Sequence, residues 1–215
     1  MRRQIPKLHL YHIPRTGGMS IGHHMRRHNV VDGVKHIAYH ISGHAHYRAM
    51  NKTYFTMMGI RDPVDHMASL YKYIRGSRAH GQHAVVSKMT FGQYIKFSRD
   101  SYLAFLTTKR KRTVENAINN LSKISFVYLT PHLDDDMGIF FKYMCTGMRW
   151  HNTRFNGTPP MEITKAEVRE VRQKRAPDVE IFEAAKRLNA AQCRFFRKHS
   201  RSGLLPDLDW SGVIV

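Results

Sequence analysis

Short apolar runs alternate with amphipathic segments along this chain of 215 residues. The runs at 7–13, 53–60 and 125–130 are rich in β-forming residues, which predicts short buried strands. Between and after them, apolar positions recur with the spacing of a helix face. Helices are therefore expected at 20–27, 64–74, 90–97, 114–124, 134–144, 164–175 and 178–200. Strands that alternate with helices predict a single α/β domain over 1–215, with a mostly parallel central sheet flanked by helices.

The helix expected at 64–74 has a clear start and a clear buried face. Asp62 can cap it, and Pro63 can occupy its first position. The predicted core-facing side carries Val64, Met67, Ala68, Tyr71 and Ile74. The following stretch, 75–88, is basic and contains glycine, so we expect an irregular and mobile loop there.

The charge balance predicts an anionic partner. Lys and Arg outnumber Asp and Glu by 35 to 16, which gives a formal net charge of +19. Nucleic acid, an acidic polysaccharide, a phosphorylated cofactor and a membrane surface are the candidate classes. Two cysteines, Cys145 and Cys193, are too few for a disulfide framework. No membrane span or signal peptide is recognisable, so we expect a cytoplasmic protein.

The first predicted strand leads into PRTGGMS, residues 14–20, before a helix. A glycine-containing turn between a strand and a helix can hold an anion, because backbone N–H groups and the positive helix end converge there. Arg15 adds a forked positive group, and Thr16 and Ser20 add hydroxyl donors. A simple tight turn is the alternative, and the Lys-containing spacing of a nucleotide-hydrolysing P-loop is missing.

A second candidate anion site follows the second predicted strand. Arg61 stands at the end of that strand, and Ser69 lies eight residues later, two turns along the next helix. Both side chains could reach one anion beside the helix start. A capped helix with a solvated arginine is the alternative.

With both segments present, the sequence resembles carbohydrate sulfotransferases related to heparan sulfate 2-O-sulfotransferase. LHLYHIPRTGGMS (8–20) is similar to the family's FLHIPKTGGTS, and YFTMMGIRDPVDHMASLYKY (54–73) is similar to its YFTFLRDPVERVLSHYYY. HISGHAHYRA (40–49) matches the family's Gly-His-x-x-Tyr/Phe segment. Further matches follow in order at 100–106, 126–137, 152–159 and 178–185, so the resemblance spans residue 8 to about residue 195.

The resemblance implies a fold, a donor and a set of roles. The expected donor is 3′-phosphoadenosine 5′-phosphosulfate (PAPS), and the expected reaction moves its sulfuryl group to a carbohydrate hydroxyl. A P-loop-like strand–loop–helix would bind the 5′-phosphosulfate, Arg61 and Ser69 would bind the 3′-phosphate, and His44 would be the catalytic base. The binding loop comprises Arg15, Thr16, Gly17, Gly18, Met19 and Ser20. Arg15 stands where the family has lysine, and Met19 where it has threonine.

In-line sulfuryl transfer resembles phosphoryl transfer, which depends on positioning and on cations at the leaving group. Arg15 is the predicted catalytic cation, and His44 can take the acceptor proton near neutral pH. No metal is required, because a sulfuryl group carries less charge than a γ-phosphate. The histidines of HH (23–24) and HAH (44–46) could ligate zinc, but no Cys pair or carboxylate stands at the spacing of a structural zinc site.

The acceptor and the compartment are less defined. An anionic carbohydrate would suit the basic residues after Ser69, although a solvated loop explains them equally well. The predicted acceptor-binding residues are Lys72, Arg75, Arg78 and His80. A basic nucleic-acid-binding protein and a P-loop-like nucleotide kinase are the alternative functions. The first leaves the ordered matches unexplained, so we expect no nucleic-acid partner. The absent P-loop lysine and the pair Arg61 and Ser69 argue against the second. Animal relatives sit in the Golgi behind a membrane anchor, which offers the Golgi lumen as the alternative location.

Overall fold

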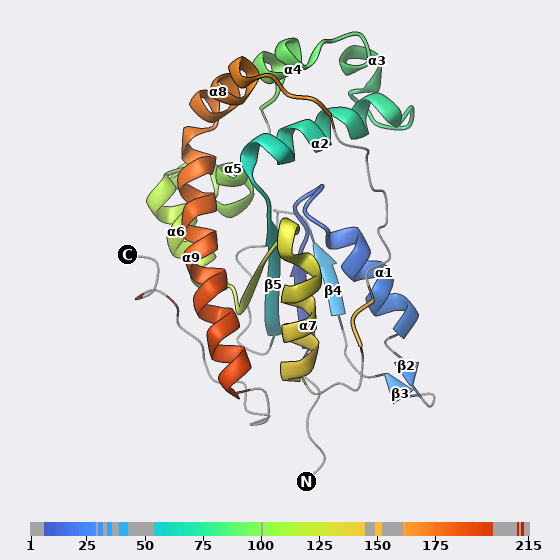
Figure 1. Ribbon diagram of the computed structural model, residues 1–215, viewed down its shortest axis with the longest axis vertical. Helices are drawn as coiled ribbons and strands as arrows, with labels where there is room; N and C mark the ends of the chain where they lie inside the picture. Colours follow the sequence, from blue (N-terminus) through green and yellow to red (C-terminus); the bar gives the residue numbers. More distant parts are fainter. Residues whose placement is uncertain are drawn as a thin grey trace.

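The computed structural model describes residues 7–28, 30–31, 34–35, 39–42, 54–99, 101–144, 149–151, 161–199, 210 and 212. Its central sheet contains β1 (Lys7–Tyr11), β4 (Tyr39–Ser42), β5 (Tyr54–Ile60) and β6 (Phe126–Leu129). The strands lie in the order β4-β1-β5-β6, and each of these pairings is parallel. The carboxyl ends of β1 and β5 therefore meet at one edge of the sheet (Figure 1).

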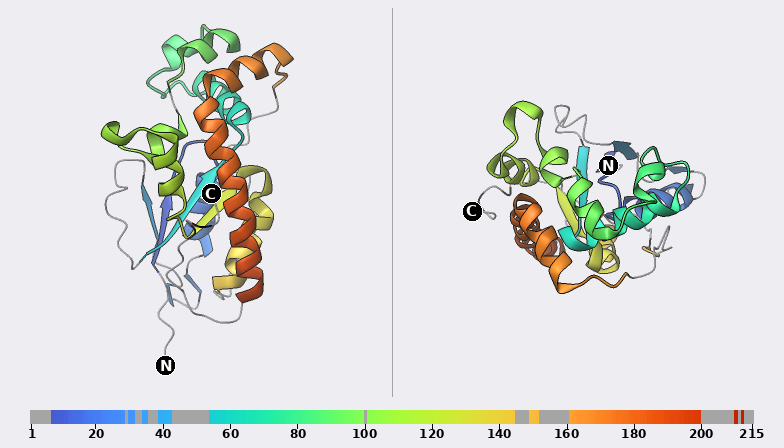
Figure 2. Two further views of the ribbon diagram at one scale, coloured as in Figure 1. Left: turned by 90° about the vertical axis from the view of Figure 1, so that its left-hand side faces the viewer. Right: turned by 90° about the horizontal axis from the view of Figure 1, so that it is seen from above.

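Helices cover both faces of this sheet. One face packs against α1 (Gly18–His28), α7 (Leu133–Met144) and α9 (Ala176–His199) through a core that includes Met57 and Phe126. The other face packs against α5 (Tyr102–Leu106), α6 (Val114–Leu121) and α9. Figure 2 shows the sheet between α5 and α6 on one side and α7 and α9 on the other. Alternating strand residues supply the two cores, as the pleat requires.

A third helical layer lies beyond the carboxyl edge of the sheet. It comprises α2 (Pro63–Gly76), α3 (His83–Val86), α4 (Phe91–Phe97) and α8 (Lys165–Lys174), which share their own apolar core. Figure 1 shows α2 crossing directly above the end of β5. Smaller elements are the antiparallel pair β2 (Val30–Val31) and β3 (Val34–Lys35) and the 3₁₀ turns Lys109–Lys111 and Thr130–His132.

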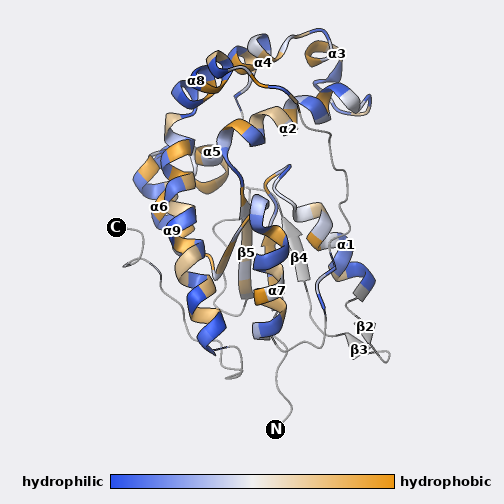
Figure 3. Cartoon of the chain, viewed as in Figure 1, coloured by the Kyte–Doolittle hydropathy of each residue, from blue (hydrophilic) through white to orange (hydrophobic). Residues whose placement is uncertain are grey.

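The sequence predicted most of these elements. The strands at 7–13, 53–60 and 125–130 are confirmed, as are all seven helices and the α/β class with its parallel sheet. The face of α2 is also confirmed, because all five residues assigned to the core are buried. In Figure 3 hydrophobic and hydrophilic residues alternate along α9, as expected for a helix with one buried face. The single-domain assignment over 1–215 stays a prediction.

One prediction needs correction, and one strand of the central sheet was missed. The stretch 75–88 is not wholly irregular: α2 continues to Gly76, and α3 forms where Val86 is buried in the core of the third layer. The sequence also gave no signal for β4, whose residues YHIS are half polar and become a strand through pairing with β1. Within the described part of the chain, no helix is both long and apolar enough to cross a membrane.

Candidate functional site

The turn that follows β1 is closed by its own polar groups. Thr16 is fully buried, and its Oγ1 donates to the Ile13 carbonyl oxygen at 2.8 Å. Arg15 and Gly17 have left-handed backbones, with φ of 68° and 89°. Glycine adopts this conformation without strain, whereas Arg15 must be held in it by its neighbours. The Ser20 N–H donates to the Gly17 carbonyl oxygen at 3.0 Å, which starts α1.

One face of α2 holds this turn. His66 Nε2 lies 2.9 Å from the Pro14 carbonyl oxygen, and the Arg15 Nε donates to Ser69 Oγ at 3.1 Å. The Arg15 guanidinium also lies over the Tyr73 ring, with Cζ 5.0 Å from the ring centroid. Positions 66, 69 and 73 share a helix face because they are spaced by three and four residues. α2 therefore fixes both the backbone and the side chain of the turn.

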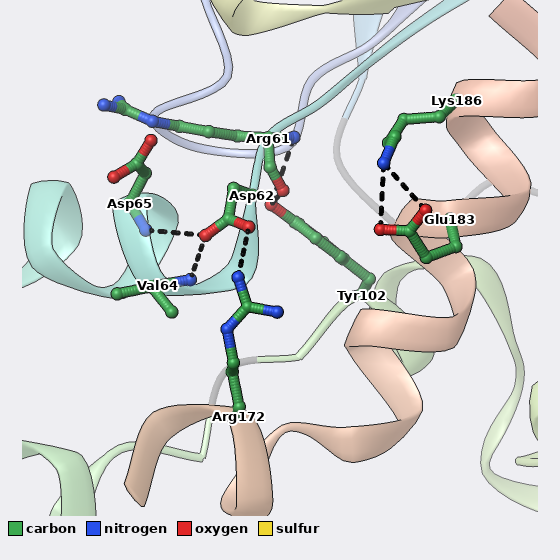
Figure 4. Close-up of polar contacts among 8 residues, drawn as sticks. All are labelled: Arg61, Asp62, Val64, Asp65, Tyr102, Arg172, Glu183 and Lys186. Carbon is green, nitrogen blue, oxygen red and sulfur yellow. Dashed lines mark hydrogen bonds and ion pairs between the residues drawn. The ribbon is translucent and has the colours of Figure 1, made fainter. Parts of the chain in front are cut away.

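Arg61 brings a second cation to the same place. Its Nη1 makes a long contact of 3.5 Å with the Arg15 carbonyl oxygen. Its backbone is held by Tyr102, whose hydroxyl donates to the Arg61 carbonyl oxygen at 2.7 Å and accepts from the Arg61 N–H at 3.3 Å (Figure 4). Arg15, Arg61 and Ser69, which come from two segments of sequence, are thus brought together.

A buried network holds the segment that carries Tyr102. Asp178 accepts a hydrogen bond from the Ser101 hydroxyl at 2.8 Å and pairs with Arg175 at 3.6 Å. Arg175 in turn donates to Ser98 Oγ at 2.9 Å. The start of α9 is therefore tied to α5, which carries the tyrosine that holds Arg61. Buried charges of this kind are tolerated only when they are paired and hydrogen-bonded.

The start of α2 is already occupied by a carboxylate. Asp62 Oδ1 accepts from the N–H groups of Val64 and Asp65 at 2.9 and 3.3 Å. Its other oxygen faces Arg172 of α8 at 3.7 Å (Figure 4). An external anion would compete with this carboxylate for the N–H groups of α2, so α2 can offer an anion its side chains but not its free end.

Burial and like charge shape the electrostatics of the site. Burial lowers the pKa of Arg15, and the nearby charge of Arg61 lowers it further. Burial also lowers the pKa of His66 to about 4, with the positive charges of Arg175, Arg61 and Arg15 acting in the same direction. His66 is therefore neutral at pH 7, and its Nε2 can act as the N–H donor to Pro14. An anion placed between Arg15 and Arg61 would relieve their mutual repulsion.

The structure places the other predicted turn residues in different environments. Gly18 packs directly against the His12 ring, where an added Cβ would clash with the ring. Met19 is 42% exposed, whereas Ser20 is buried. The Thr16 hydroxyl and the Ser20 N–H are engaged within the turn. An anion at this turn would therefore depend mainly on the charge of Arg15 and on the N-terminal end of α1.

Two of the four predicted acceptor residues, His80 and Arg75, contact different tyrosines of α2. The His80 and Tyr73 rings contact each other edge to face, with centroids 5.7 Å apart, so His80 is near Arg15. Arg75 Nη1 instead donates to the Tyr71 hydroxyl at 2.9 Å. Lys72 is partly exposed on α2, and Arg78 is exposed after it. The structure brings His80, but not Arg75, to the side of Tyr73.

The predicted base, His44, lies outside the described residues. β4 ends two residues earlier at Ser42, which pairs with Tyr11 at the end of β1. Among the described residues, no group of three or more His, Cys, Asp and Glu side chains could hold a metal ion.

Sequence reasoning missed His66, Tyr73 and Tyr102. The first two could have been found from their spacing with Ser69, since 66, 69 and 73 fall on one helix face. Tyr102 contacts Arg61 across 41 residues of sequence, and no local pattern indicates such a contact. Comparisons with protein-family models, with curated proteins and with solved structures give no significant match to this chain.

Proposed function

We propose that this protein is a PAPS-dependent sulfotransferase that acts on a carbohydrate hydroxyl. The observation that carries the proposal is the meeting of Arg15, Arg61 and Ser69 at the carboxyl edge of a parallel sheet. Ligands of open α/β sheets bind at that edge. The resemblance of the sequence to sulfotransferases assigns these same residues to the two phosphate groups of one nucleotide.

In the proposed complex the two turns bind different ends of the nucleotide. Arg15 and the P-loop-like start of α1 bind the 5′-phosphosulfate, since α1 has no acidic residue in its first turn. Arg61 and Ser69 bind the 3′-phosphate beside α2. The Arg15 Nε lies 3.1 Å from Ser69 Oγ, and the Arg61 Nη1 lies 3.5 Å from the Arg15 carbonyl oxygen. Because the two predicted phosphate sites touch, a single small molecule can contact both. Two guanidinium groups and a hydroxyl suit phosphate oxygens.

The chemistry requires a cation at the leaving group and a base at the acceptor. PAPS supplies a sulfuryl group whose transfer leaves adenosine 3′,5′-bisphosphate. Arg15 stabilises the negative charge that develops on the bridging oxygen as the sulfur–oxygen bond breaks. His44 accepts the proton of the acceptor hydroxyl as its oxygen bonds to sulfur. The acceptor in this proposal is an anionic carbohydrate that contacts the basic residues after Ser69, namely Lys72, Arg75, Arg78 and His80.

Ligand-dependent thermal stability tests the proposal first. We expect adenosine 3′,5′-bisphosphate to raise the melting temperature more than ADP or a DNA oligomer does. A larger shift with ADP would favour a kinase, and a larger shift with DNA would favour a nucleic-acid-binding protein.

Transfer of labelled sulfate from PAPS to a panel of glycans then tests the reaction and identifies the acceptor. The His44→Ala variant should lose transfer while it retains the thermal shift with the bisphosphate. Wild-type turnover in this variant would exclude His44 as the base.

A further inference from the structure

We propose that Tyr73 is a positioning residue that holds the Arg15 guanidinium in place for the nucleotide. This inference rests on the proposed function, and it adds a residue to which the sequence assigned no role. The contact between the Arg15 guanidinium and the Tyr73 ring suits arginine better than lysine. A guanidinium is flat and can lie on an aromatic ring while its N–H groups point elsewhere, whereas a lysine ammonium is a compact point charge.

The geometry leaves the Arg15 side chain defined on two sides. Its Nε donates to Ser69 Oγ at 3.1 Å, while Cζ lies 5.0 Å from the Tyr73 centroid. Because Ser69 and Tyr73 are one helical turn apart on α2, they present a hydroxyl and a ring to the same guanidinium. Nε is used by Ser69, and the guanidinium carries further N–H donors on its two terminal nitrogens.

The Tyr73 ring is itself contacted by a second ring. The His80 ring meets it at an interplanar angle of 84°, an edge-to-face arrangement. Tyr73 nevertheless remains 36% exposed, which is high for a large hydrophobic residue and places it at the surface of the site. Tyr71, two residues earlier on α2, is only 3% exposed.

Calorimetric titration with adenosine 3′,5′-bisphosphate tests the role of the ring. Tyr73→Leu should weaken binding by about threefold to tenfold, the range expected for loss of a cation–π contact. Tyr73→Phe keeps the ring and should bind within about twofold of the wild type. Phe97→Leu is the matched control, because Phe97 is an equally exposed aromatic residue (39%) on α4, in a different part of the third layer.

The same titration in an Arg15→Met background separates positioning from general packing. Tyr73→Leu should cause no further loss there, because the cation that it positions has been removed. An equal loss in both backgrounds would overturn the proposal, as would a Tyr73→Phe variant as weak as Tyr73→Leu. If the wild type binds the bisphosphate and Tyr73→Leu binds it equally well, this inference alone fails. If the wild type does not bind it, the proposed function fails and this inference with it.

Discussion

The neighbouring strands β1 and β5 each lead through a turn into a helix, and the two helix starts differ in their acidic residues. The turn after β1 has left-handed residues at Arg15 and Gly17, and the helix that follows has no acidic residue in its first turn. The turn after β5 ends in Asp62, which caps α2, and Asp65 adds a second acidic residue to the first turn of that helix. The first turn of α1 thus has no acidic residue, whereas the start of α2 is capped by a carboxylate of its own.

In the proposed complex, this difference would let the two adjacent turns bind different groups of one ligand. At α1 the resources for an anion are the helix end and the Arg15 guanidinium. At α2 the helix end is neutralised by Asp62, so an anion would depend on Arg61 and Ser69 instead. The helix of the capped turn also holds the turn after β1, because His66 contacts Pro14 while Ser69 and Tyr73 contact Arg15.

Among three predicted changes in stability, the largest should come from acid titration of His66, which contacts the Pro14 carbonyl oxygen. His66 has a pKa of about 4 when folded and about 6.5 when unfolded, so the unfolded chain binds the proton first as the pH falls. Stability is therefore lost between pH 6.5 and pH 4, by about 3 kcal/mol. Urea unfolding across this range measures the loss. His66→Gln keeps an amide N–H near Pro14 without titrating, so its stability should fall less steeply, and parallel curves would contradict the assignment.

A methyl group at the turn after β1 should produce the next largest effect. In Gly18→Ala the new Cβ clashes with the His12 ring, so we expect the free energy of unfolding to fall by about 2 kcal/mol. The matched control is Gly138→Ala in α7, where a Cβ meets open space and should stabilise the helix by up to about 1 kcal/mol. Chemical denaturation checks both. A loss that persists in a His12→Ala background would show that the clash is not its cause.

Removal of the cap of α2 should have the smallest effect of the three. Asp62→Ala loses the two hydrogen bonds to the helix start and should cost about 1 kcal/mol. Asp62→Asn keeps a capping oxygen and should be nearly neutral, because the pair with the exposed Arg172 side chain is long, at 3.7 Å, and contributes little. Equal losses from the two variants, measured by thermal unfolding, would mean that charge and not capping stabilises this turn.

The sequence predicted the turns after β1 and β5 because both depend on local signals. Glycine after a short apolar run indicated the first turn, and Asp-Pro before an amphipathic stretch indicated the second. The buried face of α2 was equally local, since it follows from apolar spacing along one helix. These features need no knowledge of how distant segments pack.

The supporting contacts could not be predicted in the same way. His66 and Pro14 are 52 residues apart, and Tyr102 meets Arg61 across 41 residues. The Thr16 hydroxyl was expected to donate to a ligand, but it donates to the Ile13 carbonyl oxygen within the turn. Tertiary packing decides which partner such a polar group takes. His44 lies outside the described residues, so its role stays a prediction.

Calorimetry on Arg61→Ala with two nucleotides tests the central claim most directly, namely that the two turns hold opposite ends of one bisphosphate nucleotide. Loss of Arg61 should weaken the binding of adenosine 3′,5′-bisphosphate by about tenfold or more, the effect expected for loss of a hydrogen bond to a charged group. Adenosine 5′-monophosphate lacks the 3′-phosphate, so its affinity should not change. An equal loss for both nucleotides would contradict the account, because Arg61 would then not discriminate between the two ends.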